Sequence, residues 1–457
     1  AQALILQGEI ESAESQWRKI LEINPRNMAA IAPLVEQLLK RGDHVGAEII
    51  VADVTQSDVT TTAPLELLIQ IRAARKDWRG AILALNRLED MPNATPVATF
   101  WSGFLAAKQG RSQDAIGHFQ HALAIQPDYR QALEGLSRIY QTGGHNAEWI
   151  AYLTAYTKQN PDSVIGLEFL ASAHVGEKNW RAAENCLLRA GAIQPANTEL
   201  MLKRLDVVER QDSARAESQL TEWIKNQPDE FKFKMRLADF YATRKRYSEA
   251  ESLLRVMVNQ DSTAKQTSAV KLKLAELALL RRDMAAANAY LDEIFGQQPD
   301  HLQALRLAAQ LYVMQNDIDK AIEAYKRVLK RTPLNDEAAN NLADLLATYR
   351  ADDKDSMAKA TTLVERFEDA RHPALLDTYG WVQLKAGNIQ QAVMALRRAE
   401  AGAPNDPRIH YHLAEAYSKT GNTQAAIGQL QRSLADGKGE FLEIQTAKAL
   451  LQQLQKN

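Results

Sequence analysis

Small apolar residues recur along the chain with an almost constant period, each inside an amphipathic stretch. The first four, Ala13, Ala47, Ala81 and Ala115, are 34 residues apart. A small residue at the same place in every stretch is typical of positions where two helices touch. The series continues at intervals of 32 to 39 residues and predicts thirteen helices in one register, the later markers being Trp149, Ala183, Ala216, Ala250, Ala287, Ala321, Ala360, Ala392 and Ala426.

A partner helix is predicted before each marked helix. Eight stretches have a small residue twelve positions before the marker, and eight have proline twelve positions after it, where proline ends a helix. Glycine lies in several of the turns, where a left-handed conformation is required. We therefore expect helix–turn–helix pairs and no strands. The small first-helix residues are Gly103, Ser137, Ala171, Ala238, Ala275, Ala309, Gly380 and Ala414; the turn glycines are Gly42, Gly110, Gly144, Gly387 and Gly421; the prolines are Pro25, Pro127, Pro161, Pro195, Pro228, Pro299, Pro333 and Pro404.

The clearest pair of repeats lies in residues 376–434. Its first half contains Leu376, Tyr379 and Gly380, and its second half contains His410, Leu413 and Ala414, each 34 positions later. This spacing resembles the tetratricopeptide repeat family, in which bulky, small and aromatic residues alternate over 34 positions. The resemblance implies an all-α, right-handed α-solenoid, a superhelix of about 12–13 helix–turn–helix repeats.

Some stretches depart from the pattern. Residues 1–92 read as degenerate repeats, since Val35 and Ile69 replace the small first-helix residue. Trp149 is expected to wedge its helix pair apart, and Arg204 to weaken the seventh repeat. We expect one continuous solenoid over residues 1–438, with polar insertions near 260–269 and 349–356 that form loops. Residues 439–457 are expected to form a capping helix, from about 440 to 455, with an apolar stripe of Phe441, Ile444, Ala447, Leu450, Leu451 and Leu454.

Composition narrows the possible partners only slightly. Of 457 residues, 46% are hydrophobic and 25% charged, which is typical of a folded chain. A net charge of −2 gives no general attraction to nucleic acid or to an acidic membrane. The only cysteine, Cys186, excludes an internal disulfide. The sequence contains no run of 18 apolar residues, so it predicts no membrane span. The chain begins inside a helical pattern, as a mature or trimmed fragment would.

Catalytic and metal-binding patterns are missing from the sequence. It contains no phosphate-binding loop, nucleophile elbow or dinucleotide fingerprint. His410 and His412 are two positions apart on a predicted helix, so they point in different directions and cannot bind one metal ion together. Cys186 is expected to be a buried structural thiol. Basic residues are not confined to one repeat position, which disfavours a nucleic-acid reader. We expect neither an enzyme nor a cofactor or metal.

The family resemblance also implies which side chains face a partner. In tetratricopeptide proteins the first helices line a concave groove, and ligand-facing residues lie three before and one after the small residue. Trp381 is the strongest candidate, and its alternative is packing against the next first helix around His412. Glu134 and Arg138 could equally pair with each other. The implied groove residues are Phe100, Phe104, Glu134, Arg138, Met235, Asp239, Arg306, Gln310, Asn340, Asp377, Trp381, Tyr411 and Glu415.

A narrower resemblance rests on the phrases DTYGWV and IHYHLA in the last repeats. They resemble bacterial tetratricopeptide lipoproteins encoded with exopolysaccharide and PEP-CTERM protein-sorting systems. This implies a non-catalytic scaffold for protein or peptide partners, in the periplasm or at the outer membrane. Two alternatives stay open: a cytoplasmic scaffold of a signalling or assembly machine, and a repeat module of a larger polysaccharide-export protein with an enzyme or β-barrel flank. The sequence leaves the oligomeric state open.

Overall fold

The computed structural model describes residues 10–56, 61–258, 263–436 and 443–456. Regular structure in these ranges consists of 26 α-helices and one short 3₁₀ helix, without a strand. The prediction of an all-α chain is therefore confirmed. None of these helices is both long and apolar enough to cross a membrane. The chain divides into two compact units, one within residues 11–253 and one within residues 254–457, and the division falls within helix α16.

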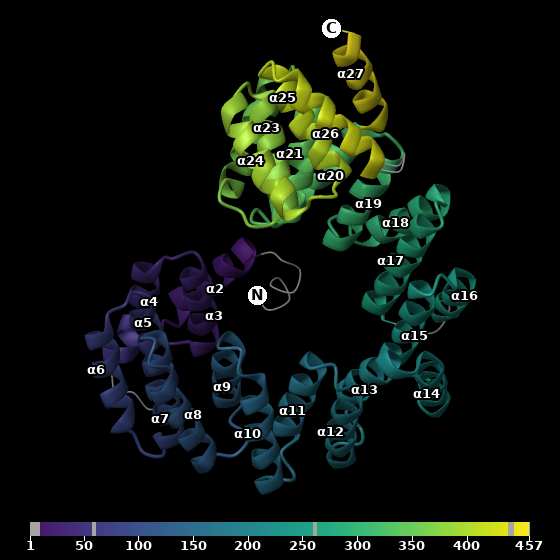
Figure 1. The fold of residues 1–457 in the computed structure, drawn as a ribbon. Helices are drawn as coiled ribbons and strands as arrows, with labels where there is room; N and C mark the ends of the chain where they lie inside the picture. Colours follow the sequence, from purple (N-terminus) through teal and green to yellow (C-terminus); the bar gives the residue numbers. More distant parts are fainter. Residues whose placement is uncertain (1–9, 57–60, 259–262, 437–442, 457) are drawn as a thin grey trace. The chain divides into compact units, whose positions relative to one another are not determined.

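The first unit contains helices that follow one another in chain order from α2 to α15, with α16 at the division (Figure 1). Even-numbered helices carry the small marker residues, so they are the second helices of the repeats. The bounds are α2 Ile10–Ile23, α3 Met28–Lys40, α4 His44–Gln56, α5 Ala63–Ala74, α6 Trp78–Glu89, α7 Thr95–Lys108, α8 Ser112–Ile125, α9 Arg130–Thr142, α10 Asn146–Gln159, α11 Val164–Gly176, α12 Trp180–Ile193, α13 Thr198–Gln211, α14 Ser213–Asn226, α15 Phe231–Thr243 and α16 Tyr247–Val258.

The second unit continues the same alternation of first and second helices. Its bounds are α17 Ala264–Leu280, α18 Met284–Gln297, α19 Leu302–Met314, α20 Ile318–Arg331, α21 Asp336–Tyr349, α22 Lys354–Val364, the 3₁₀ helix η1 Glu365–Phe367, α23 Pro373–Lys385, α24 Ile389–Gly402, α25 Pro407–Lys419, α26 Thr423–Asp436 and α27 Ile444–Lys456.

The marker residues lie where the helices of each pair touch. Twelve of the thirteen are alanines with no exposed surface, and the thirteenth, Trp149, is 2% exposed. A Cβ atom on Gly380 would lie 2.7 Å from Cγ of Leu396, and one on Gly103 would lie 2.8 Å from the Phe119 ring. The small residues are thus required by close packing between helices, and the predicted register is confirmed.

Enlarging Gly103 is expected to destabilise the α7–α8 pair. In Gly103→Val the new atoms would press on the Phe119 ring, and overpacking of this kind costs about 1–3 kcal/mol. Gly117→Ala is the matched control, because a Cβ there meets nothing within 4 Å and removing a helix glycine gains about 0.5–1 kcal/mol. Urea unfolding followed by circular dichroism should move the midpoint down for the first variant and up for the second. A shift in the same direction for both would contradict this packing.

The turns within the pairs share one left-handed residue. All five predicted turn glycines have positive φ angles, from 72° to 87°. In other repeats the same place is taken by a longer residue with φ between 56° and 61°, which costs about 1–2 kcal/mol relative to glycine. The turn geometry is therefore set by the packing of the helices rather than by glycine. These longer residues are Lys76, Lys178, Lys245, Arg282 and Asn316.

Two departures from the pattern have clear structural consequences. Trp149 lies inside the α9–α10 pair, stacked on Tyr140 with ring centroids 5.4 Å apart. Arg204 lies half-buried over the Trp223 ring at 5.4 Å, and burial lowers its pKa. Bulky aromatic contacts thus replace the small-residue contact in these repeats.

Of the two predicted insertion loops, the first is placed wrongly. Residues 264–269 begin helix α17, where Thr263 accepts from the Gln266 backbone and forms a capping box with it. Residues 260–262 lie outside the described residues. In the second stretch, α21 ends at Tyr349 and α22 begins at Lys354, which leaves a short turn. The additional residues of that repeat lie in this turn and in the first turn of α22, close to the predicted stretch.

Successive repeats are joined by their first helices and by a recurring arginine. Contacts run from α3 through α5, α7 and α9 to α11, and in the second unit from α21 through α23 to α25. Six positions after the marker, an arginine donates to a carbonyl oxygen near the end of the preceding second helix, which satisfies groups that a helix end leaves unpaired. The six bonds are Arg87 to Thr55, Arg189 to Thr157, Arg327 to Pro299, Arg366 to Pro333, Arg398 to Glu368 and Arg432 to Pro404.

The last helix, α27, lies where the sequence predicts one. It packs against α26, and Ala447 is fully buried. Three leucines of the predicted stripe, Leu450, Leu451 and Leu454, are partly buried against the same core. Phe441 lies outside the described residues. The apolar side of α27 thus covers the last repeat.

Candidate partner-binding surfaces

Three of the residues implied to face a partner have exposed side chains. Glu134 and Arg138 lie on α9, and Gln310 lies on α19. No ion pair joins Glu134 to Arg138 among those found in the described ranges. Their charges are available to solvent and to a protein partner. First helices therefore present free polar side chains at the register positions that the resemblance implies.

The phenylalanines of α7 belong to an aromatic cluster. Phe100 is half-buried, with ring centroids 5.6 Å from Phe119 and 5.4 Å from Tyr129. Phe104 lies 4.9 Å from Trp101, whose Nε1 donates to Glu66 at 3.0 Å. Burial and the nearby Glu66 carboxylate raise the pKa of Tyr129 to about 12. Most of this aromatic surface is used inside the protein.

Four further candidates are half-buried. Met235 and Asp239 lie on α15, and Arg306 on α19 pairs with Glu337 on α21. Asn340 donates to Asn341 at 3.3 Å, and Asn341 donates to Tyr325 at 3.0 Å. Arg306 thus links two first helices, and Asn340 bonds a neighbour on its own helix.

Trp381 and Tyr411 are interior residues in this structure. Each is 2% exposed. The Trp381 ring stacks on His412 with centroids 4.0 Å apart and planes 16° apart, and its Nε1 donates to Thr348 at 2.9 Å. The packing interpretation of Trp381 is therefore confirmed, and the interpretation as an exposed anchor is wrong for the chain alone. The reason is that His412 of the next first helix covers the indole face.

The other two candidates of this region, Asp377 and Glu415, bond to residues next to Trp381. His412 has no exposed surface, and its Nδ1 lies 2.8 Å from Oδ1 of Asp377. Tyr411 donates to Glu415 at 2.5 Å, and burial together with that carboxylate raises the Tyr411 pKa. Lys385 lies 3.2 Å from Glu415 and 4.0 Å from the centre of the Trp381 ring. Asp377, Trp381, Tyr411 and Glu415 thus form one network between α23 and α25.

Arg408 connects three helices beside this network. It pairs with Asp344 of α21 and, at 3.1 Å, with Glu443 just before α27. Its side chain is 32% exposed, whereas those of Asp344 and Glu443 are 13% and 8% exposed. Burial alone would lower the Arg408 pKa, but the two carboxylates outweigh it and raise the pKa. Sequence reasoning missed Arg408, because it precedes the positions that the family pattern marks.

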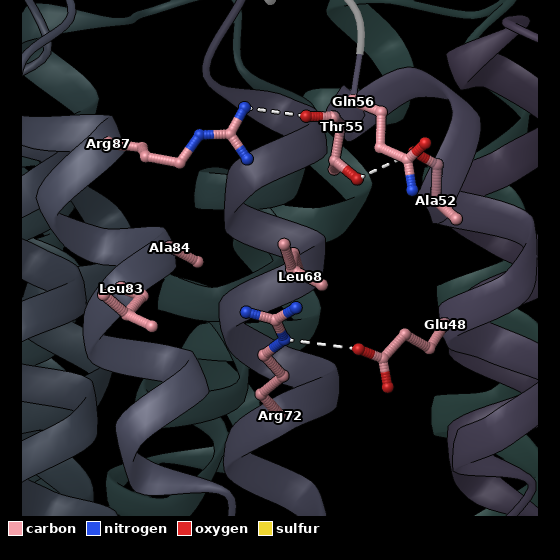
Figure 2. Close-up of a pocket in the computed structure, with 9 residues that line it drawn as sticks. All are labelled: Glu48, Ala52, Thr55, Gln56, Leu68, Arg72, Leu83, Ala84 and Arg87. Atoms are coloured by element: carbon pink, nitrogen blue, oxygen red, sulfur yellow. Dashed lines mark hydrogen bonds and ion pairs between the residues drawn. The ribbon is translucent and has the colours of Figure 1, made fainter.

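A cleft lies in the first unit, between the second helices α4 and α6 and over the first helix α5. Its volume is about 400 Å³. Figure 2 shows Leu68 and Arg72 on the central helix, Arg87 on one side and Glu48 on the other. This cleft belongs to the degenerate repeats, where the pattern predicts no site. The other lining residues are Ala52, Thr55, Gln56, Leu83 and Ala84.

The described residues offer few side chains that could bind a metal ion or act as a nucleophile. The described residues contain no group of three or more His, Cys, Asp or Glu side chains that could hold a metal ion. Cys186 is 5% exposed, and burial raises its pKa, so the thiol is held in its unreactive neutral form. His410 is fully buried, with Nδ1 2.7 Å from Gln429 and Nε2 3.0 Å from the Pro404 carbonyl oxygen. Both side chains have structural surroundings.

Two curated relatives align with long parts of the chain. One is cellulose synthase operon protein C of Pseudomonas fluorescens (strain SBW25), 20% identical over 345 residues, or 70% of this chain and 27% of that protein. The other is human tetratricopeptide repeat protein 21B, 27% identical over 143 residues, or 31% of this chain and 11% of that protein. The chain thus spans a minor part of the length of both relatives.

One solved structure and two family models are similar to this chain. The crystal structure of the APC/C hetero-tetramer Cut9–Hcn1 contains a chain that is 15% identical, with a TM-score of 0.43, covering 99% of this chain and 95% of that one. A family model described as tetratricopeptide repeat matches residues 278–356 and 383–451. A second, described as tetratricopeptide repeat protein 21 ARM repeat, matches residues 183–316. With the helix-pair register, these family matches show that the chain is a tetratricopeptide repeat protein, built on a fold that serves as a scaffold for protein–protein interactions.

Proposed function

We propose that the chain is a scaffold that gathers protein components of a bacterial exopolysaccharide synthesis or export system in the cell envelope. The observation that carries the binding part is the row of first helices with exposed polar side chains at ligand-facing positions, namely Glu134, Arg138 and Gln310. The setting is supported by the alignment of 70% of the chain with cellulose synthase operon protein C. Partners are proteins or peptides, and no chemistry is assigned to the scaffold itself.

Two other settings have some support. The aligned 345 residues make up 27% of the cellulose-operon relative, which favours a repeat module of a larger polysaccharide-export protein. The matches to tetratricopeptide repeat protein 21 favour a scaffold of an assembly machine without any link to the envelope. Fractionation of the source cells separates these settings, since the envelope proposal expects the chain in the periplasmic or outer-membrane fraction.

Affinity capture from the source bacterium tests the proposal. The tagged wild type is expected to retain synthase or export subunits of an exopolysaccharide system. The double variant Glu134→Lys, Arg138→Glu should retain about ten-fold less, because the charge pattern facing the partner is reversed. Glu222→Lys, Lys225→Glu on the second helix α14 is the matched control, since both side chains are exposed and the net charge is likewise unchanged.

The control should capture as much as the wild type. Equal recovery by all three proteins, with equal helicity by circular dichroism, would contradict binding at the first helices. Recovery of partners unrelated to polysaccharide export would contradict the envelope setting while leaving the scaffold role intact.

A further inference from the structure

The cleft between α4 and α6 has the features of a site for a partner side chain. It lies on the second-helix side of the repeats, away from the first-helix residues that the family resemblance marks. Its walls come from two successive second helices, and its floor, including Leu68, comes from α5 (Figure 2). A volume of about 400 Å³ falls within the range of roughly 300–1,000 Å³ typical of ligand sites. It fits a short extended segment better than a whole helix.

The charges of the cleft are unbalanced. Glu48 accepts from Arg72 Nε at 3.2 Å and from Arg75 Nη1 at 2.5 Å, so one carboxylate serves two guanidinium groups. Arg87 adds a third cation. The lining itself holds two arginines against one glutamate, an excess of one positive charge, and Arg75 outside the lining shares the same glutamate.

The arginines also retain donor capacity. Arg72 Nη1 donates to the Gly80 carbonyl oxygen at 2.9 Å, and Arg87 Nη2 donates to the Thr55 carbonyl oxygen at 2.7 Å. These bonds fix both guanidinium groups in place. Each guanidinium has five N–H donors, and the bonds found among the described residues use only some of them. Figure 2 shows Leu68 between the Arg87 and Arg72 side chains.

Apolar surface adjoins these cations. Leu68 and Ala84 lie at the base of the cleft, 5% and 1% exposed, while Leu83 on the rim is 56% exposed. On α4, Val45 and Ile49 are 61% and 69% exposed. They precede Ala52 and Gln56 by helical spacing, so they extend the same side of α4 beyond the cleft. An occupant would therefore meet two fixed cations next to uncovered apolar side chains.

We propose that this cleft binds a partner-protein segment in which an Asp or Glu side chain lies next to a large apolar residue. The carboxylate accepts from Arg72 and Arg87, as charge-assisted hydrogen bonds between guanidinium and carboxylate do. The apolar residue covers Leu83 and Leu68. This inference rests on the proposed function, since it gives the chemistry of one partner of the scaffold, and it adds a binding surface separate from the first helices.

Fluorescence anisotropy of the full chain with labelled peptides tests the cleft. The probe is a short peptide centred on Leu-Asp-Leu-Glu-Leu, and its comparison peptide has Asn and Gln in place of the acids. Arg87→Gln and, separately, Leu83→Gln should each weaken binding of the acidic probe about ten-fold, and the neutral peptide should bind about ten-fold more weakly to the wild type. Arg210→Gln, an exposed arginine of α13, is the matched control and should leave binding unchanged.

Three results would overturn the inference. One is equal affinity for the acidic and neutral peptides. Another is equal weakening by Arg87→Gln and Arg210→Gln, which would indicate general electrostatic attraction. The third is tighter, Arg87-dependent binding of a phosphoserine version, which would assign the cleft to phosphopeptides. Loss of peptide binding while capture of envelope partners persists would contradict the cleft alone, whereas the failure of capture with peptide binding intact would contradict only the proposed function.

Discussion

Replacing Trp381 with alanine is expected to destabilise the α21, α23 and α25 helices by about 3–5 kcal/mol, the usual cost of truncating a buried tryptophan. The indole stacks on His412 and bonds Thr348 through Nε1. The ammonium group of Lys385 also lies over the Trp381 ring, 4.0 Å from its centre. Truncation would leave a cavity lined by these groups and remove the hydrogen-bond partner of Thr348. The network between the first helices α23 and α25 therefore depends on Trp381.

Hydrogen exchange measured by mass spectrometry can locate this effect within the full chain. Protection of α23 and α25 should fall strongly in Trp381→Ala, while α5 and α7 in the other unit serve as the internal reference. In a repeat protein the loss is expected to be local, because each repeat contacts only its neighbours. Trp381→Phe is the control, since it keeps an aromatic ring against His412 while losing the N–H and part of the indole, so its loss of protection should be smaller than that of the alanine variant. Unchanged protection in the alanine variant would contradict the described packing.

Arg408→Met is expected to produce a loss of similar size, about 3–5 kcal/mol, for a different reason. The substitution leaves the carboxylates of Asp344 and Glu443 largely buried and without their cation. Removing one partner of a buried ion pair is costly because the remaining charge stays uncompensated. The loss should appear as faster hydrogen exchange in α21, α25 and α27, the helices that Arg408 connects.

A compensated variant makes this prediction specific. Arg408→Met combined with Asp344→Leu and Glu443→Leu removes all three charges, and replacing a whole buried ion pair with apolar residues is often nearly neutral. Most of the lost protection should therefore return in the triple variant. If the triple variant is less protected than Arg408→Met, the charges are not what connects the helices, and the ion-pair explanation is wrong.

The sequence predicts the repeat register well because that register rests on steric contact. Only a very small residue fits where two helix axes come close, so alanine and glycine recur at fixed spacing. In the first repeats Val35 and Ile69 take the first-helix place and are fully buried, so the register still marks an interior position where the contact accommodates a larger side chain. Local patterns of this kind need no knowledge of distant residues.

The first insertion was misplaced because polarity was given more weight than capping. The stretch around Thr263 is polar, yet Thr263 and Gln266 carry the capping-box spacing that begins a helix. That signal is readable from the sequence alone. The arginine six positions after the marker is a second readable signal, since it recurs in six repeats and bonds the preceding repeat in each.

The candidate surfaces were harder to predict, because exposure depends on what the next repeat supplies. Trp381 occupies a ligand-facing position, but His412, 31 residues later, covers its ring. Arg138 occupies the equivalent place on α9 and is exposed. Register gives the direction of a side chain from its helix axis and says nothing of the partner it meets. The α4–α6 cleft escaped for a related reason, since Arg72 and Arg87 come from different helices with no common spacing.

Site-specific photo-crosslinking tests most directly whether partners bind across the first helices. A photoreactive amino acid is placed at Arg138 on α9 or at Gln310 on α19, and at Glu222 on α14 as the second-helix reference. In cells that contain the captured partners, each of the first two positions is expected to give a partner adduct, and Glu222 is expected to give none. Adducts from Glu222 alone, or no partner adduct at Arg138 and Gln310, would contradict a scaffold that binds through its first helices.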